Sequence, residues 1–425
     1  MRNVFITILL LVSTFAVAES VPLITIDGAI NPVSAKFILR NLEQAQEEGA
    51  SCFIILLDTP GGLMTSTEDL TRAIMSSDVP VVVYVYPRGG RAASAGVFIS
   101  YSSHIVAMTP GTRIGAAHPV SMMGSGGKSD STETMMEKVA NDAVANVRAM
   151  ALERGRNPDW PEKAVRKSES ITADKALELG VVDLIAEDVE DLLIKINGLA
   201  YGLEKEDTLR LKKPVAIERK MTNVEDFLFV ILNPNIAYML MMLGMVGIYL
   251  ELQNPGGILP GVVGAISILL ALYAFQILPV NYVGIAFLIL AVALFILEAN
   301  TPTFGLLTTG GVVSMLAGSF LLTSGNATLF TISWSVILPT VALAAIISIF
   351  VLWKAVKARI SQPKTGKEGM IGLKGVVVEK ASPNLKNSYI EIHGELWAAF
   401  GEGLSLGNEV VVIAIESGKL KVKKV

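Results

Sequence analysis

A stretch with hardly any Lys or Arg, from residue 226 to 357, places the strongest limit on how this chain can fold. Turn-forming residues divide it into five apolar segments, at 227–252, 257–276, 280–298, 303–323 and 333–355. Each segment has about 20 residues, the length that a helix needs to cross the hydrocarbon core of a bilayer. The sequence therefore predicts an all-α membrane bundle of about five transmembrane helices in residues 226–357.

The overall composition agrees with a membrane protein and excludes several other classes. Of the 425 residues, 52% are hydrophobic and only 17% are charged, which is unusual for a soluble protein. The net charge is −4 and no basic block is dense enough to follow a phosphate backbone, so we expect no nucleic-acid partner. Cys52 is the only cysteine and lies in an apolar run, which predicts a core residue and no Cys-based metal cluster. The three histidines are scattered, and we expect no metal and no cofactor.

The N-terminus predicts export. Arg2 precedes an apolar stretch, and Ala16-Val17-Ala18 has the small-x-small pattern of a signal peptidase site. Residues 1–18 are therefore predicted to be a signal peptide, the alternative being a short uncleaved anchor. Five crossings from an exported start would leave the C-terminus in the cytoplasm, which agrees with the basic segment 354–367 after the last crossing.

Residues 19–200 alternate buried strands with helices. Apolar runs at 21–26, 52–57 and 80–86 have no polar alternation, as in strands buried on both faces of a sheet. Helical patterns near 32–48 and 65–77 lie between them. This order predicts an α/β domain with a largely parallel sheet. The polar residues 201–225 are interpreted as a linker, with the tail of the domain as the alternative.

The C-terminal residues 366–425 predict a small all-β barrel. Short strands at 375–378, 389–393, 395–398 and 409–414 are separated by Gly, Asn and Pro turns. Five strands would form an OB-like fold. The segment lacks a basic groove with interleaved aromatic residues, so docking of a protein partner is the better interpretation.

Two segments of the α/β domain carry residue patterns that suggest chemistry. Gly61 and Gly62 follow a buried strand, where glycines allow backbone amides to point into a cleft and bind a developing oxyanion. Downstream, Ser94 lies among small residues at the start of a helix, so the amide of Ala95 can join that of Gly62 beside the serine oxygen. The alternative for Ser94 is a simple helix N-cap.

Taken together, these motifs resemble a known family. The segments Asp58-Thr-Pro-Gly-Gly62, Ala92-Ala-Ser94-Ala-Gly96 and Thr109-Pro-Gly-Thr-Arg-Ile-Gly-Ala116 are similar to the Clp-protease and signal-peptide-peptidase superfamily, whose fold is Clp-protease/crotonase-like. The order of signal peptide, protease domain, membrane bundle and barrel resembles that of the long NfeD proteins. The resemblance implies a serine protease that uses a lysine and associates with stomatin-like (band 7) membrane proteins. Dimers or larger homo-oligomers are also expected for this superfamily.

Two residues compete for the role of general base. Lys138 matches the position of the family's catalytic lysine, and Thr134 and Glu137 predict a capping box that would place Lys138 near the positive end of a helix. The alternative for Lys138 is a solvated lysine paired with Asp142. His118 is the rival, but alignment with Clp proteases puts their histidine at Ala117, and in an extended segment one step turns a side chain to the opposite face. Lys138 is therefore favoured.

The leading functional hypothesis is a membrane-bound serine endopeptidase that cleaves hydrophobic or membrane-protein segments as part of membrane protein quality control. The main alternative is a non-catalytic scaffold for stomatin-like proteins. A crotonase-type thioester enzyme is a second alternative, but export separates the domain from cytoplasmic coenzyme A. Polar residues of the membrane segments lie near the segment ends, where an ion pathway would not need them, so structural or interfacial roles are expected for Glu251, Gln253, Gln276 and Glu298.

Overall fold

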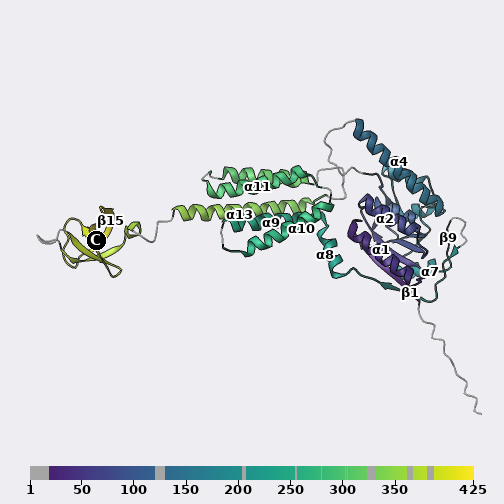
Figure 1. Cartoon of the computed structure of the whole chain (residues 1–425), viewed down its shortest axis with the longest axis horizontal. Coiled ribbons are helices and arrows are strands. Elements are labelled where there is room, and N and C mark those ends of the chain that lie inside the picture. The colour runs from purple at the N-terminus through teal and green to yellow at the C-terminus, as the bar shows by residue number, and fades with distance from the viewer. Residues whose placement is uncertain are drawn as a thin grey trace, which may run out of the picture. The chain divides into compact units, whose positions relative to one another are not determined.

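The computed structural model describes residues 19–119, 130–202, 207–253, 256–278, 280–301, 303, 305–322, 331–360, 367–380 and 387–425. The predicted signal peptide, residues 1–18, and the predicted dividers at 254–255 and 324–326 lie outside these residues. Contacts divide the chain into two compact units, Met1–Ile346 and Ile347–Val425. The first contains the α/β domain and most of the membrane helices, and the second contains the barrel (Figure 1).

A six-stranded parallel sheet forms the centre of the α/β domain, with the strand order β11-β1-β2-β3-β5-β8. Its strands are β1 (Glu19–Asp27), β2 (Phe53–Asp58), β3 (Val81–Val85), β5 (Ile105–Met108), β8 (Leu184–Ile185) and β11 (Pro214–Glu218). The predicted strands and the predicted α/β class are confirmed. A second, three-stranded sheet joins β4 (Arg91–Ala93), β6 (Arg113–Gly115) and β7 (Ser170–Thr172).

Helices cover both faces of the main sheet (Figure 1). One face packs against α1 (Pro32–Glu47), α2 (Met64–Met75), α3 (Ala95–Ser102), α4 (Asp130–Glu153), α5 (Trp160–Lys167) and α6 (Ala173–Glu178). The other face packs against α7 (Val189–Ile196) and the segment around Leu209 and Leu211. Cys52 is fully buried on this second face, where burial raises the pKa of its thiol to about 12, as expected for an unreactive core residue.

The segment interpreted as a linker, 201–225, is largely structured and belongs to the α/β domain. It completes β9 (Ala200–Tyr201), forms β10 (Asp207–Thr208) and β11, and begins α8 (Asn223–Ile231). β11 pairs with β1 in parallel, from Glu19 opposite Pro214 to Leu23 opposite Glu218. β11 is short and lies at the sheet edge, where three of its five residues are exposed, so its sequence lacks the long apolar run of a strand buried on both faces.

The membrane helices are α9 (Pro234–Gln253), α10 (Leu259–Ile277), α11 (Tyr282–Asn300), α12 (Leu306–Leu322) and α13 (Trp334–Ile360). Pro234–Gln253, Leu259–Ile277 and Trp334–Lys354 are long and apolar enough to cross a bilayer, whereas Tyr282–Glu298 and Leu306–Leu322 are shorter apolar helices. The predicted first segment, 227–252, is split, because Pro234 starts a new helix and disfavours helical geometry at Asn233.

Four of these helices form two closely packed antiparallel pairs, α9 with α10 and α11 with α12. A Cβ on Gly264 of α10 would lie 2.9 Å from the carbonyl oxygen of Gly244 on α9, and one on Gly284 of α11 would lie 2.5 Å from the Cα of Leu322 on α12. Glycine thus allows the backbones to approach, as in other membrane helix pairs. The Glu298 carboxylate accepts the N–H groups of Gly305 and Thr308 at 2.9 Å, so it satisfies the start of α12, in line with the expected structural role.

The C-terminal unit contains a closed five-stranded barrel with the order β12-β13-β14-β16-β15. Its strands are β12 (Lys374–Glu379), β13 (Ser388–Ile392), β14 (Glu395–Phe400), β15 (Glu409–Glu416) and β16 (Lys419–Lys424), preceded by the short 3₁₀ helix η2 (Lys367–Met370). Val377, Ile390, Val410 and Val412 fill its core. The predicted small OB-like barrel is confirmed.

Candidate active site

The loop after β2 is joined directly to the strand that leads to Ser94. The Thr59 N–H donates to the Arg91 carbonyl at 2.7 Å, and the Ala93 N–H donates to the Thr59 carbonyl at 3.0 Å. The Asp58 carboxylate accepts the Arg91 N–H at 3.0 Å. The two segments that the sequence singled out therefore form one rigid unit at the carboxyl edge of the sheet.

Gly61 and Gly62 are required by their geometry. Gly61 has a φ of +134°, which residues with side chains rarely adopt, and a Cβ on Gly62 would lie 2.2 Å from the Ile30 carbonyl oxygen. The Gly61 N–H donates to Thr59 Oγ1 at 3.1 Å. Among the described residues, the Gly62 N–H donates to no group, so it is the amide of this turn that is free to bind a ligand.

Ser94 occupies an unusual backbone conformation, with φ 52° and ψ −109°. An N-cap serine normally has an extended backbone, and its hydroxyl accepts a hydrogen bond from the first turn of the helix. Ser94 does neither, since its side chain makes no capping bond to α3. Ser94 therefore occupies the N-cap position of α3 without acting as a side-chain cap, and its half-buried hydroxyl is left available. Strain of this kind in a non-glycine residue is typical of functional sites.

Small residues let α3 start close to the loop that follows β2. A Cβ on Gly96 would lie 2.8 Å from Thr59 Cγ2 and 3.1 Å from the Ala92 Cβ. The Ala95 N–H is the first amide of α3 and, among the described residues, has no acceptor. It therefore points out of the positive end of the helix next to Ser94.

The end of β6 contacts Ser94, and the residues that follow it include His118. The Ser94 N–H donates to the Gly115 carbonyl at 3.0 Å. Ala117 is buried, whereas His118 is exposed, so neighbouring side chains point to opposite sides. His118 Nδ1 lies 2.8 Å from the Val165 carbonyl oxygen on α5, which fixes the ring toward that helix.

Lys138 is not brought to Ser94 in this structure. It lies on α4 with an exposed side chain, and no contact joins it to Ser94 among the described residues. The predicted capping box is wrong, because α4 begins at Asp130 and Thr134 lies inside it. The later turns of α4 pack on the core, through Val147 and Ala151.

One supporting contact was missed by the sequence analysis. The buried guanidinium of Arg156 donates to the Ser103 carbonyl at 2.8 Å and to the Asp183 carboxylate at 2.7 Å, at the end of α3 opposite Ser94. Arg156 thus supplies a hydrogen-bond donor to the carbonyl groups at the carboxyl end of α3, the helix that begins beside Ser94. A lone arginine in a loop gives no sequence pattern that predicts such a contact.

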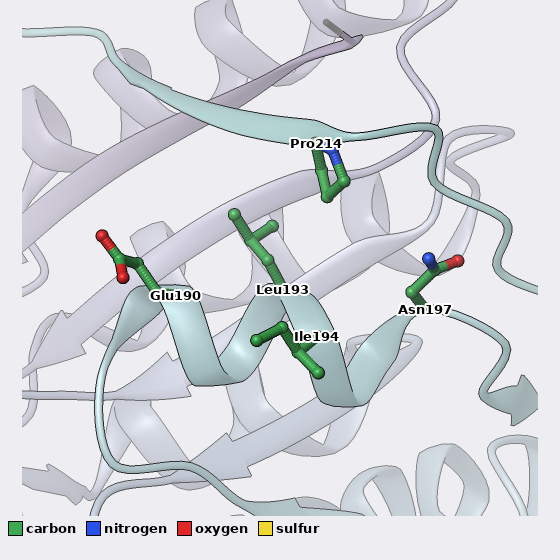
Figure 2. A pocket seen from close by; sticks show the side chains of 5 residues that line it. All are labelled: Glu190, Leu193, Ile194, Asn197 and Pro214. Carbon is green, nitrogen blue, oxygen red and sulfur yellow. The ribbon is translucent and has the colours of Figure 1, made fainter.

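A cavity of about 330 Å³ lies elsewhere on the domain (Figure 2). Its lining residues are Glu190, Leu193, Ile194, Asn197 and Pro214, from α7, the residue that follows it, and the start of β11. α7 packs on the opposite face of the sheet from α3, so this cavity is separate from the Ser94 site.

Comparisons with family models match the chain in three parts. Residues 20–202 match the NfeD1b N-terminal domain, 235–354 match the NfeD integral membrane domain, and 367–424 match the NfeD-like C-terminal, partner-binding domain.

Similar proteins span nearly the same length. The chain is 33% identical to the membrane-bound protease PH1510 of Pyrococcus horikoshii over 98% of this chain and 96% of the relative. It is 30% identical to the membrane protein NfeD1b of Bacillus subtilis over 75% of this chain and 72% of that protein. A solved structure of a mutant 1510-N membrane-bound stomatin-specific protease with a substrate peptide is 30% identical, with a TM-score of 0.46, and covers 51% of this chain and 98% of that one. The chain therefore belongs to the NfeD family, as a long-form member that is a membrane-bound serine protease.

Proposed function

We propose that this protein is an endopeptidase in which Ser94 is the nucleophile and Lys138 the general base. The observation that carries the proposal is the backbone at Ser94, which is strained and leaves the hydroxyl free of any capping bond. A scaffold without catalysis would gain nothing from that strain.

The oxyanion hole is proposed to consist of the Gly62 and Ala95 amides. Among the described residues neither N–H group has an acceptor, and stabilisation of a developing oxyanion requires such unoccupied donors. Gly61, whose own amide is bonded to Thr59, contributes the turn that directs Gly62.

The proposed reaction follows the usual two steps of a serine protease. Lys138 Nζ takes the Ser94 hydroxyl proton while Oγ attacks the scissile carbonyl. The tetrahedral intermediate collapses, the C–N bond breaks, and the leaving amine receives the proton from Lys138. Water then hydrolyses the acyl-enzyme by the same route. Because Lys138 is exposed in this structure, the dyad requires the first turns of α4 to approach Ser94.

The dyad is tested by cleavage of a soluble apolar peptide by the full-length protein. Ser94→Ala and Lys138→Ala should each lower kcat/KM by roughly a thousandfold or more, and the double variant should be little worse, because nucleophile and base act as one unit. His118→Ala is the matched control and should retain activity within about threefold. A lysine base works only when neutral, so the wild-type rate should still be rising on the alkaline side of neutrality.

Two results would count against this assignment. If His118→Ala loses cleavage while Lys138→Ala retains it, the histidine is the base. If Ser94→Ala keeps both cleavage and labelling by a serine-reactive phosphonate, Ser94 is not the nucleophile. Mixing the Ser94→Ala and Lys138→Ala proteins adds a further distinction, since recovered cleavage would mean that a second copy in a homo-oligomer supplies the lysine.

We further propose that the barrel docks a stomatin-like membrane protein. The match of residues 367–424 to a partner-binding domain supports this role, and the barrel lies in a different unit from Ser94. Deleting 367–425 should leave cleavage of a soluble peptide unchanged and abolish co-purification of a stomatin-like protein. Loss of peptide cleavage in the deleted protein would contradict a pure docking role.

A further inference from the structure

Helix α8 carries an apolar stripe that none of the described residues of its own unit covers. Val224, Phe227 and Val230 recur every three residues and are 68%, 53% and 47% exposed. Residues at this spacing lie on one side of a helix. In the α/β domain a row of this kind would normally be packed against the core.

The opposite side of α8 is fixed to the α/β domain. Arg40 on α1 forms an ion pair with Glu225 at 2.8 Å, and Phe229 packs so closely on Gly28 that a Cβ there would lie 3.0 Å from its ring. A capping box at Thr222 and Glu225 defines the start of the helix. α8 is therefore an ordered part of the domain with its apolar stripe turned outward.

The position of α8 in the chain identifies what covers this stripe. α8 ends at Ile231, and the first membrane helix, α9, begins at Pro234. Three residue steps span no more than about 11 Å, so the end of α8 lies at the level where the chain enters the bilayer. α8 also contacts both α9 and α10. An exposed apolar stripe at this level faces the boundary between lipid headgroups and acyl chains.

We propose that α8 is an interfacial anchor that inserts Phe227, Val224 and Val230 into the lipid surface and holds the protease domain against the membrane. Apolar residues on one face and a polar opposite edge are typical of helices that lie in the interface.

This anchor also sets the direction in which the active site faces. The Gly28 N–H donates to the Asp58 carbonyl, and the Ile30 N–H donates to the Gly61 carbonyl, both at 2.9 Å. α8 thus packs on the end of β1, to which the loop that carries Gly61 and Gly62 is hydrogen-bonded. If the proposed function holds, the Ser94 site opens near the bilayer surface and acts on polypeptide segments presented there.

Depth measurements test the anchor without any reference to catalysis. Cys52 is fully buried, so a nitroxide attached to Phe227→Cys in full-length protein in phosphatidylcholine vesicles reports on position 227. We expect it to collide more with oxygen than with a water-soluble nickel chelate. The matched control is Ile194→Cys. Ile194 is an apolar residue of the same domain and is 73% exposed on α7, so a label there should collide more with the nickel chelate than with oxygen. Equal exposure of both labels to water would overturn the proposal.

A second measurement tests the orientation of the site. The same peptide is offered free in solution or tethered by an acyl chain to the vesicles that hold the enzyme. The double variant Phe227→Ser/Val230→Ser should cleave the free peptide normally and the tethered peptide at least about fivefold more slowly, whereas Ile194→Ser should change neither. Unchanged cleavage of the tethered peptide would overturn the orientation. If wild type cleaves neither peptide, the proposed function fails. The depths of the nitroxide labels still show whether α8 inserts into the lipid surface.

Discussion

At the scale of single residues, the backbone of Ser94 links stability to function. A side chain at φ 52° and ψ −109° is strained, and glycine is the residue that relieves such strain. Ser94→Gly should therefore be more stable than Ser94→Ala by about 1 kcal/mol, although both lack the hydroxyl. Urea unfolding of the 19–220 fragment measures the difference. If the glycine variant is no more stable than the alanine variant, the strain inferred from the backbone is absent.

His104 makes stability depend on pH. Burial, together with Arg154 and Arg156, lowers the pKa of this imidazole from 6.5 to about 3, and its Nδ1 accepts the Val81 N–H at 3.1 Å. The unfolded chain takes up a proton near pH 6.5 whereas the folded domain does not, so stability is full above pH 6.5 and falls as the pH is lowered toward 3. His104 changes the free energy of unfolding by at most about 1.4 kcal/mol per pH unit.

The variant His104→Asn isolates this contribution, because its amide oxygen can accept the Val81 N–H and does not titrate. Between pH 6.5 and 4 its unfolding free energy should fall less steeply than that of wild type. Carboxylates contribute equally to both proteins, so the difference between the two curves belongs to His104. Parallel curves would show that the buried imidazole is protonated in the folded state.

At the scale of elements, the edge strand β11 decides where the soluble domain ends. A fragment 19–200 lacks β11 and also Leu209 and Leu211, which are 3% and 5% exposed. Loss of two buried leucines removes about 4 kcal/mol, and β1 becomes an unpaired edge. Fragment 19–200 should therefore unfold at a lower urea concentration than 19–220. Leu209→Ala/Leu211→Ala in 19–220 separates side-chain burial from strand pairing, and equal stability of the two fragments would contradict this account.

At the scale of the whole molecule, the number of crossings can differ without changing the topology. α11 and α12 form one antiparallel pair, so they add either two crossings or none to those of α9, α10 and α13. The count is odd in both cases, and the protease domain and the barrel should lie on opposite sides of the membrane. Reporter fusions at residues 205 and 425 should give opposite locations, with the protease side exported. The same location at both points would contradict an odd count.

The sequence by itself determined the features that depend on local pattern. Side-chain periodicity and turn chemistry are local properties, so each can be recognised in a window of about 20 residues. Such windows are enough to predict apolar runs of bilayer length, strands buried on both faces and Gly-rich turns. The membrane helices, the parallel sheet and the barrel were predicted on this basis. The position of Ser94 beside a glycine loop was predicted in the same way.

The tertiary structure alone decided the features that depend on residues far apart in the chain. β11 is a strand because β1, almost 200 residues earlier, offers it an edge. α4 begins at Asp130, before the capping box that its local sequence predicts at Thr134, and α8 is fixed by Arg40 and Gly28, which no nearby pattern indicates. The strained backbone at Ser94 persists because the Gly115 carbonyl and the Thr59 loop hold it on both sides, and such support exists only once the sheet has formed.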